Sequence, residues 1–81
     1  MNIKVLFFAQ LKDVFGTGGR TAEVRQGTTV GEFVRSLFEE PNASRLKKLP
    51  VLYSVNEDFV DENRELKNRD TLALLPPVAG G

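Results

Sequence analysis

The residues best suited to chemistry in this sequence are its last two, Gly80 and Gly81. Glycine has no Cβ, so a backbone that ends in Gly-Gly can enter a channel too narrow for other residues. Such a chain can place its terminal carboxylate against reactants that another enzyme holds. The alternative is a frayed chain end, because termini are commonly disordered and glycine-rich.

The segment before the glycines favours the chemical interpretation. After Asp70 the chain has no charged side chain, so burying this segment in a partner costs little desolvation free energy. Pro76 and Pro77 cannot donate hydrogen bonds to a sheet and they fix φ, so a strand must end there and the chain must continue in an extended direction. Val78 and Ala79 are small.

We therefore divide the chain into a folded domain over residues 1–75 and an extended, flexible tail over residues 76–81 that ends in Gly-Gly. Fully extended at about 3.3–3.6 Å per residue, the tail reaches about 20 Å beyond the domain. This length suffices to thread the active-site cleft of a partner, so we expect the tail to contact that partner and Gly81 to be the group that reacts.

Composition limits what the chain can do by itself. With 81 residues, 41% of them hydrophobic and 27% charged, it is predicted to be one soluble globular domain. It has no cysteine and no histidine, so thiolate chemistry, disulfides and the usual metal ligand and neutral-pH acid–base group are missing. We expect no metal and no bound cofactor, and this composition argues against a self-sufficient hydrolase or metalloenzyme.

The charge balance limits the partners. Eleven basic and eleven acidic residues cancel, which leaves no excess positive charge to bind nucleic acid or an anionic membrane. The chain also lacks an apolar run long enough to span a bilayer and the layout of a signal peptide. We expect a cytoplasmic protein with protein partners.

Hydrophobic periodicity predicts the elements that carry the tail. Strands are predicted over residues 3–8, 20–24, 51–55 and 71–75, with a short return at 59–60 after a turn at 56–58. Helices are predicted over residues 10–15, 30 to about 39, and 44–49. In the main helix Thr29 and Glu32 form a capping box, and the apolar residues fall on one face.

Strands that share one amphipathic helix form a two-layer α+β roll. The best match is a ubiquitin-like β-grasp, in which the long helix covers one face of a mixed sheet. The periodicity supports the two layers, and the strand order rests on analogy.

The other face of this sheet is also predicted to carry apolar side chains. Because side chains alternate along a strand, Leu6 and Phe8 share the face of Lys4, which we assign to solvent. Leu75 faces the same way, and Phe59 follows a turn. Phe8, Phe59 and Leu75 favour a partner interface. The alternative, which we favour for Leu6, is that the short helix or a loop covers these side chains in a second small core.

Several segments together resemble the ThiS/MoaD family of ubiquitin-like sulfur carriers, and within it the small subunits of molybdopterin synthases. They are the opening Ile-Lys-Val-Leu-Phe-Phe-Ala-Gln with Gly16 after it, Thr28-Thr29-Val30, Val55-Asn56, and Asp70 leading to Leu-Leu-Pro-Pro-Val-Ala-Gly-Gly. The likeness covers essentially the whole length, and the first and last segments are specific in combination.

The resemblance implies a mechanism. A ubiquitin-activating-type adenylating enzyme would use ATP and Mg²⁺ to adenylate Gly81, and a sulfur donor would convert the adenylate to a thiocarboxylate. The tail would enter the large subunit of molybdopterin synthase, in a heterotetramer, and donate sulfur to cyclic pyranopterin monophosphate. The chain itself would be a non-catalytic subunit, inactive alone. The family's apolar contact surface corresponds to Phe8, Phe59 and Leu75.

The sequence departs from the family pattern at two places. Arg69-Asp70 replaces a common Gly-Asp turn, so we expect Asn68 to adopt the left-handed conformation instead. Leu74-Leu75 replaces a commonly aromatic pair. Three other functions remain open: a ThiS-like sulfur carrier for thiamine, a protein modifier conjugated through the same C-terminal glycine, and an interaction domain whose Gly-Gly has no chemistry.

Overall fold

A computed structural model describes residues 1–77, and the predictions for Val78, Ala79, Gly80 and Gly81 lie outside the described residues. The elements are β1 (Asn2–Phe7), α1 (Gln10–Phe15), β2 (Gly19–Glu23), α2 (Val30–Leu37), the 3₁₀ turn η1 (Ser44–Leu46), β3 (Leu52–Val55), β4 (Asp58–Val60) and β5 (Thr71–Leu75). Every predicted strand and helix is present, with bounds that differ by up to three residues.

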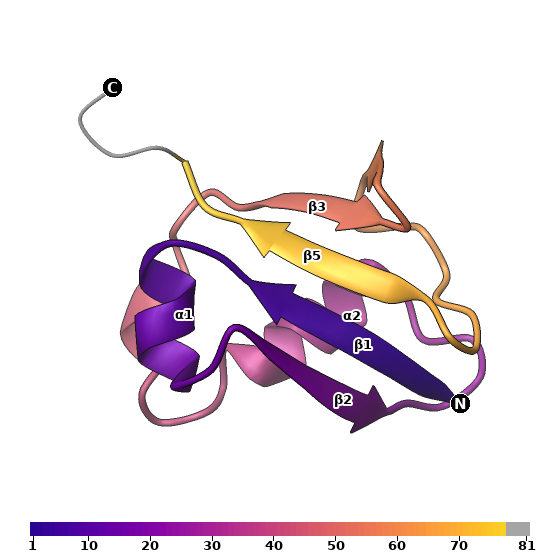
Figure 1. The fold of residues 1–81 in the computed structure, drawn as a ribbon, viewed down its shortest axis with the longest axis horizontal. Helices are drawn as coiled ribbons and strands as arrows, with labels where there is room; N and C mark the ends of the chain where they lie inside the picture. Colours follow the sequence, from indigo (N-terminus) through magenta and orange to yellow (C-terminus); the bar gives the residue numbers. More distant parts are fainter. Residues whose placement is uncertain (78–81) are drawn as a thin grey trace.

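Within residues 1–77 the strands form one five-stranded sheet in the order β2-β1-β5-β3-β4. The central strands β1 and β5 are parallel, and the other neighbours pair antiparallel. Figure 1 shows α2 behind this sheet, with β1 and β5 ending at the same edge. The predicted α+β class and β-grasp arrangement are therefore confirmed.

The core lies between the sheet and α2, where the predicted alternation brings the apolar residues together. Ile3, Val5 and Phe7 of β1 are buried, and Leu72 and Leu74 of β5 are fully buried beside them. The buried residues of α2 are Val30, Phe33, Val34 and Leu37. The apolar positions of the strands and of the helix thus meet in one contiguous core.

The capping box starts α2 as predicted. The Thr29 hydroxyl accepts a hydrogen bond from the Glu32 backbone N–H at 3.2 Å, and the Glu32 carboxylate accepts one from the Thr29 backbone N–H at 3.0 Å. The helix ends at Leu37, earlier than predicted, because the backbone N–H groups that follow Phe38 bond three residues back: Glu39 to Ser36 and Glu40 to Leu37.

An aromatic cluster holds α1 against the end of β1. The rings of Phe7 and Phe15 stack with centroids 4.3 Å apart. The Arg20 guanidinium lies 5.6 and 5.4 Å from those two centroids and forms an ion pair with Glu40 at 2.8 Å. This cluster fixes the position of the turn between β1 and α1, which carries Phe8.

The helices of residues 1–77 are short. None is long and apolar enough to cross a membrane, and α2 has only eight residues.

Candidate functional site

The face of the sheet opposite α2, called here the outer face, carries a continuous row of side chains. Strand register places Leu6 beside Ala73, Ala73 beside Ser54, and Ser54 beside Phe59. Because residues in register on neighbouring strands point to the same face, these four side chains from β1, β5, β3 and β4 share the outer face. Thr71 and Leu75 lie on it too, as predicted from the sequence.

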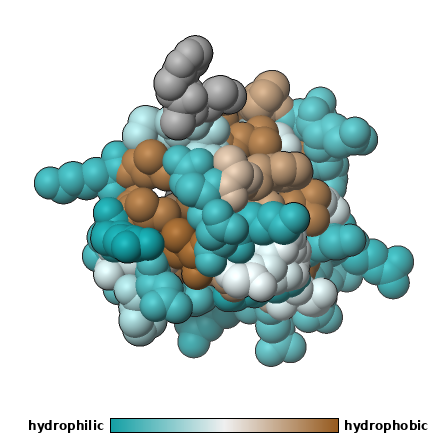
Figure 2. All heavy atoms as spheres, turned by 60° about the vertical axis from the view of Figure 1, so that its left-hand side comes forward, coloured by the Kyte–Doolittle hydropathy of each residue, from teal (hydrophilic) through white to brown (hydrophobic). Residues whose placement is uncertain are grey.

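The exposed large hydrophobic side chains of residues 1–77 all lie on or beside this face. They are Phe8, Leu52 and Phe59, which are 43%, 61% and 72% exposed. A covered second core is therefore wrong for Phe8 and Phe59. Figure 2, turned toward the edge where β1 and β5 end, shows brown apolar side chains exposed among teal polar ones.

Leu52 is the functional candidate that sequence reasoning missed. It pairs with Leu75 in the β3–β5 register and so extends the apolar surface across β3. Strand alternation in the sequence could have identified Leu52, because it puts this side chain on the opposite face from Val51, Tyr53 and Val55.

A groove of about 570 Å³ runs along the outer face. One end is apolar and the other polar, and its lining residues are Leu6, Phe8, Ser54, Asn56, Glu57, Thr71, Ala73 and Leu75. The groove therefore brings Phe8 and Leu75 together, whereas Phe59 lies on the same face outside the groove. Leu6 is half-buried beside Gly19, where an added Cβ would lie 3.3 Å from Leu6 Cδ2.

The predicted tail begins at the end of β5. The strand ends at Leu75, Pro76 is buried and Pro77 is exposed. The fold therefore holds the chain up to Pro76, at the apolar end of the groove. The remaining predicted site residues, Val78, Ala79, Gly80 and Gly81, are among those that the structure does not describe.

A buried carboxylate organises the polar end of the groove. Asp70 is only 5% exposed, and its Oδ1 accepts a hydrogen bond from Asn56 Nδ2 at 2.9 Å. Its Oδ2 accepts one from the Lys67 backbone N–H at 2.7 Å and lies 3.9 Å from Arg64 Nη2. Asn56 Oδ1 in turn accepts from the Thr71 backbone N–H at 2.9 Å. These bonds tie the start of β5 to the β3–β4 turn.

The turn before β5 differs from the prediction. Arg69, not Asn68, adopts the left-handed conformation, with φ of 71°. Asn68 uses its side chain instead, because its Oδ1 accepts a hydrogen bond from the Asn2 backbone N–H at 2.9 Å. The prediction for Asn68 was wrong because this contact joins residues far apart in the sequence.

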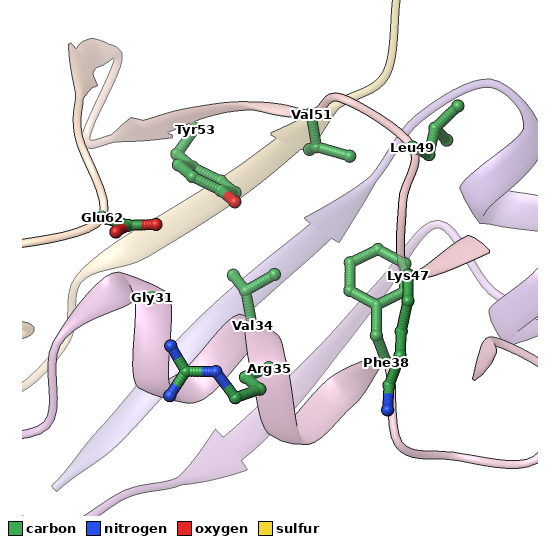
Figure 3. A pocket seen from close by; sticks show the side chains of 9 residues that line it. All are labelled: Gly31, Val34, Arg35, Phe38, Lys47, Leu49, Val51, Tyr53 and Glu62. Carbon is green, nitrogen blue, oxygen red and sulfur yellow. The ribbon is translucent and has the colours of Figure 1, made fainter. Parts of the chain in front are cut away.

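A second groove, of about 360 Å³, lies on the other side of the sheet. Figure 3 shows Tyr53 and Val51 facing Val34 of α2 and Phe38, the residue after α2, across it, with Glu62 beside Tyr53. Partial burial, followed by the nearby Glu62 carboxylate, raises the pKa of Tyr53 above its usual range. Arg35 and Lys47 lie on the α2 side.

The surface formed by residues 1–77 has the features of a protein-binding surface. Within residues 1–77 no three His, Cys, Asp or Glu side chains gather in a way that could hold a metal ion. The outer face offers a groove with an apolar end and exposed aromatic rings, which are features of protein interfaces.

This chain is similar to known proteins in sequence and in fold. The family model described as ThiS family matches residues 5–81. The chain is 34% identical over 82 residues to the molybdopterin synthase sulfur carrier subunit of Escherichia coli (strain K12), covering 98% of this chain and 99% of the relative.

Two solved structures share the fold along nearly the whole chain. SAMP1 from Haloferax volcanii has a TM-score of 0.84 at 24% identity and covers 100% of both chains. A protein–protein complex of subunits 1 and 2 of the molybdopterin-converting factor from Helicobacter pylori 26695 contains a chain with a TM-score of 0.72 at 26% identity, also covering 100% of both. Since the family model spans nearly all residues, this chain belongs to the ThiS family.

Proposed function

We propose that this chain is the sulfur-carrier subunit of a molybdopterin synthase. The observation that carries the proposal is the 34% identity to the Escherichia coli sulfur carrier subunit over nearly the full length of both chains. Relatives of the same name in Arabidopsis thaliana and Chlamydomonas reinhardtii match over the whole of this chain as well.

The chemistry takes place at the Gly81 carboxylate. A carboxylate oxygen attacks the α-phosphorus of ATP on an activating enzyme, and pyrophosphate leaves. This step makes the acyl carbon electrophilic, because AMP is a far better leaving group than oxide. A sulfur donor then supplies sulfide to the acyl carbon and AMP departs, which leaves a thiocarboxylate. Mg²⁺ accompanies ATP on the activating enzyme, not on this chain.

The thiocarboxylate then delivers its sulfur to cyclic pyranopterin monophosphate in the large subunit. The outer face docks that subunit through Phe8, Leu52, Phe59 and Leu75, and β5 directs residues 76–81 into its active site. The complex of subunits 1 and 2 from Helicobacter pylori supports a partner of this kind. We propose the heterotetramer typical of the family, in the cytoplasm.

The carrier is a substrate of its partners and is inactive alone. Its sequence has no histidine or cysteine to act as acid, base or nucleophile. Gly80 and Gly81 therefore supply a narrow, reactive chain end, and the partners supply the catalytic groups.

A change of length at the chain end tests the proposal. Addition of one alanine after Gly81 moves the carboxylate out of register with the active sites, so sulfur transfer to the pterin should be lost while thermal unfolding is unchanged. An alanine added before Met1 is the matched control and should leave transfer intact. Full sulfur transfer by the C-terminally extended chain would contradict the proposal, and Gly81-dependent protein conjugates in its place would favour a protein modifier.

A further inference from the structure

The polar end of the outer-face groove carries a carboxylate that the fold does not use. Glu57 lines this end and is exposed. The ion pairs found within residues 1–77 are Arg20 with Glu40 and Arg64 with Asp70, so Glu57 has no cationic partner in that part of the chain. The Glu57 carboxylate therefore forms no ion pair that stabilises residues 1–77 of the folded domain.

The backbone at Glu57 is unfavourable for this residue type. Val55 pairs with Asp58, so Asn56 and Glu57 form a two-residue hairpin loop, with φ of 52° and 74°. Such loops favour asparagine followed by glycine, because both positions need positive φ. Asn56 fits this preference. A glutamate at the second position holds a left-handed backbone that a Cβ disfavours.

The charged residues near Glu57 differ in the face of the sheet to which they point. Asp58 follows Glu57 and is also exposed, but it pairs in register with the core residue Val55 and so points to the other face of the sheet, whereas Glu57 lines the outer-face groove. The cation in register on the same face is Lys4, which pairs with Thr71 on β5 and forms no ion pair within residues 1–77. A docking protein therefore meets an apolar surface at Phe8 and Leu75 and the Glu57 carboxylate at the β3–β4 turn.

We propose that Glu57 is a specificity residue of the outer face. It pairs with an arginine or lysine of the partner protein, and an apolar side chain of the same partner occupies the groove. Residues with strained backbone conformations cluster at functional sites, and an unpaired carboxylate at the polar end of this groove fits a partner of complementary charge. The inference rests on the proposed function for the identity of the partner, the large subunit of molybdopterin synthase.

Charge variants of Glu57 test this pairing. Binding of the full chain to the large subunit from the same genome is measured by titration calorimetry at several salt concentrations. Glu57→Gln should weaken binding about fivefold at low salt, as expected for an exposed ion pair. Glu57→Lys should weaken it tenfold or more. Both differences should shrink as salt screens the charges.

Glu39→Gln, which removes an exposed carboxylate from the segment after α2, is the matched control and should bind like the parent chain.

A glycine variant separates the charge from the backbone. Glu57→Gly should unfold at a higher temperature than the parent, because glycine tolerates positive φ, yet bind the large subunit as weakly as Glu57→Gln. A stabilised variant that binds poorly cannot be explained by misfolding.

Failure of the pairing at Glu57 can be told apart from failure of the proposed function. If the parent chain binds but Glu57→Gln and Glu57→Lys bind equally well with the same salt dependence, the inference for Glu57 is wrong and the proposed function stands. If the parent chain does not bind the large subunit at all, the proposed function fails and this inference fails with it.

Discussion

Asn56 and Asp70 are joined across the polar end of the outer face by a hydrogen bond of 2.9 Å from Asn56 Nδ2 to Asp70 Oδ1. The two residues lie fourteen positions apart in the sequence. Asn56 also accepts from the backbone N–H of Thr71, the first residue of β5. This pair therefore sets where the strand that leads to the C-terminal tail begins.

Removing the buried carboxylate should destabilise the domain. Asp70→Ala leaves Asn56 Nδ2 and the Lys67 backbone N–H without their acceptor, so the free energy of unfolding should fall by about 1–3 kcal/mol. Urea unfolding followed by circular dichroism measures this loss. Glu39→Ala, at an exposed carboxylate, is the control and should change stability by less than about 0.5 kcal/mol. Equal stability of the two variants would show that Asp70 does not organise the turn.

The left-handed backbone at Arg69 predicts that glycine is preferred there. Arg69→Gly and Arg69→Ala remove the same side chain, but only alanine keeps a Cβ at a φ of 71°. The glycine variant should therefore be about 1 kcal/mol more stable than the alanine variant. Thermal unfolding of the two proteins compares them directly, and a more stable alanine variant would rule out the positive φ.

Phe8 should matter more for binding than for folding. It is 43% exposed, so Phe8→Ala should lower the free energy of unfolding by less than about 1 kcal/mol and weaken binding to the large subunit tenfold or more. Phe7→Ala is the contrasting variant, because Phe7 is buried and its truncation should cost about 3–5 kcal/mol of stability. If Phe8→Ala instead unfolds at much lower denaturant and binds normally, Phe8 belongs to the core.

The titration of Tyr53 tests the groove beside α2. Burial and Glu62 raise its pKa above the usual value, so the folded state keeps this proton to higher pH than the unfolded state does. The stability contribution of Tyr53 is therefore present below a pH of about 10 and is lost as the pH rises through the raised pKa. The chain has a single tyrosine and no tryptophan, so tyrosinate absorbance reports this group alone.

Two variants complete the Tyr53 test. Tyr53→Phe should lessen the loss of stability at alkaline pH, and Glu62→Gln should bring the midpoint of the absorbance titration closer to that of free tyrosine. A midpoint at or below the free value in the parent protein would contradict the burial of this side chain.

Local patterns predicted most of the fold because they act within one element. The capping box of Thr29 and Glu32 starts α2 at Val30, and alternation places Thr71, Ala73 and Leu75 on the outer face. Both features depend on residues a few positions apart, so the sequence alone contains them.

The rest of the site depends on contacts between distant residues. Buried Asp70 is bonded to Asn56 of the β3–β4 turn, and the turn that contains left-handed Arg69 is bonded to Asn2 through Asn68 Oδ1 and the Arg69 backbone N–H. The groove that contains Glu57 exists only because β5 lies between β1 and β3. Such pairings depend on strand order and register, and hydrophobic periodicity along the sequence does not predict them.

Intact-mass spectrometry shows whether the Gly81 carboxylate carries sulfur. The chain is incubated with the activating enzyme from the same genome, ATP, Mg²⁺ and a sulfur source, with a Gly81 deletion variant treated in parallel. We expect a mass shift that corresponds to replacement of one terminal oxygen by sulfur, confined to the intact chain. An unchanged mass in an incubation that converts ATP to AMP and activates a known carrier would contradict it.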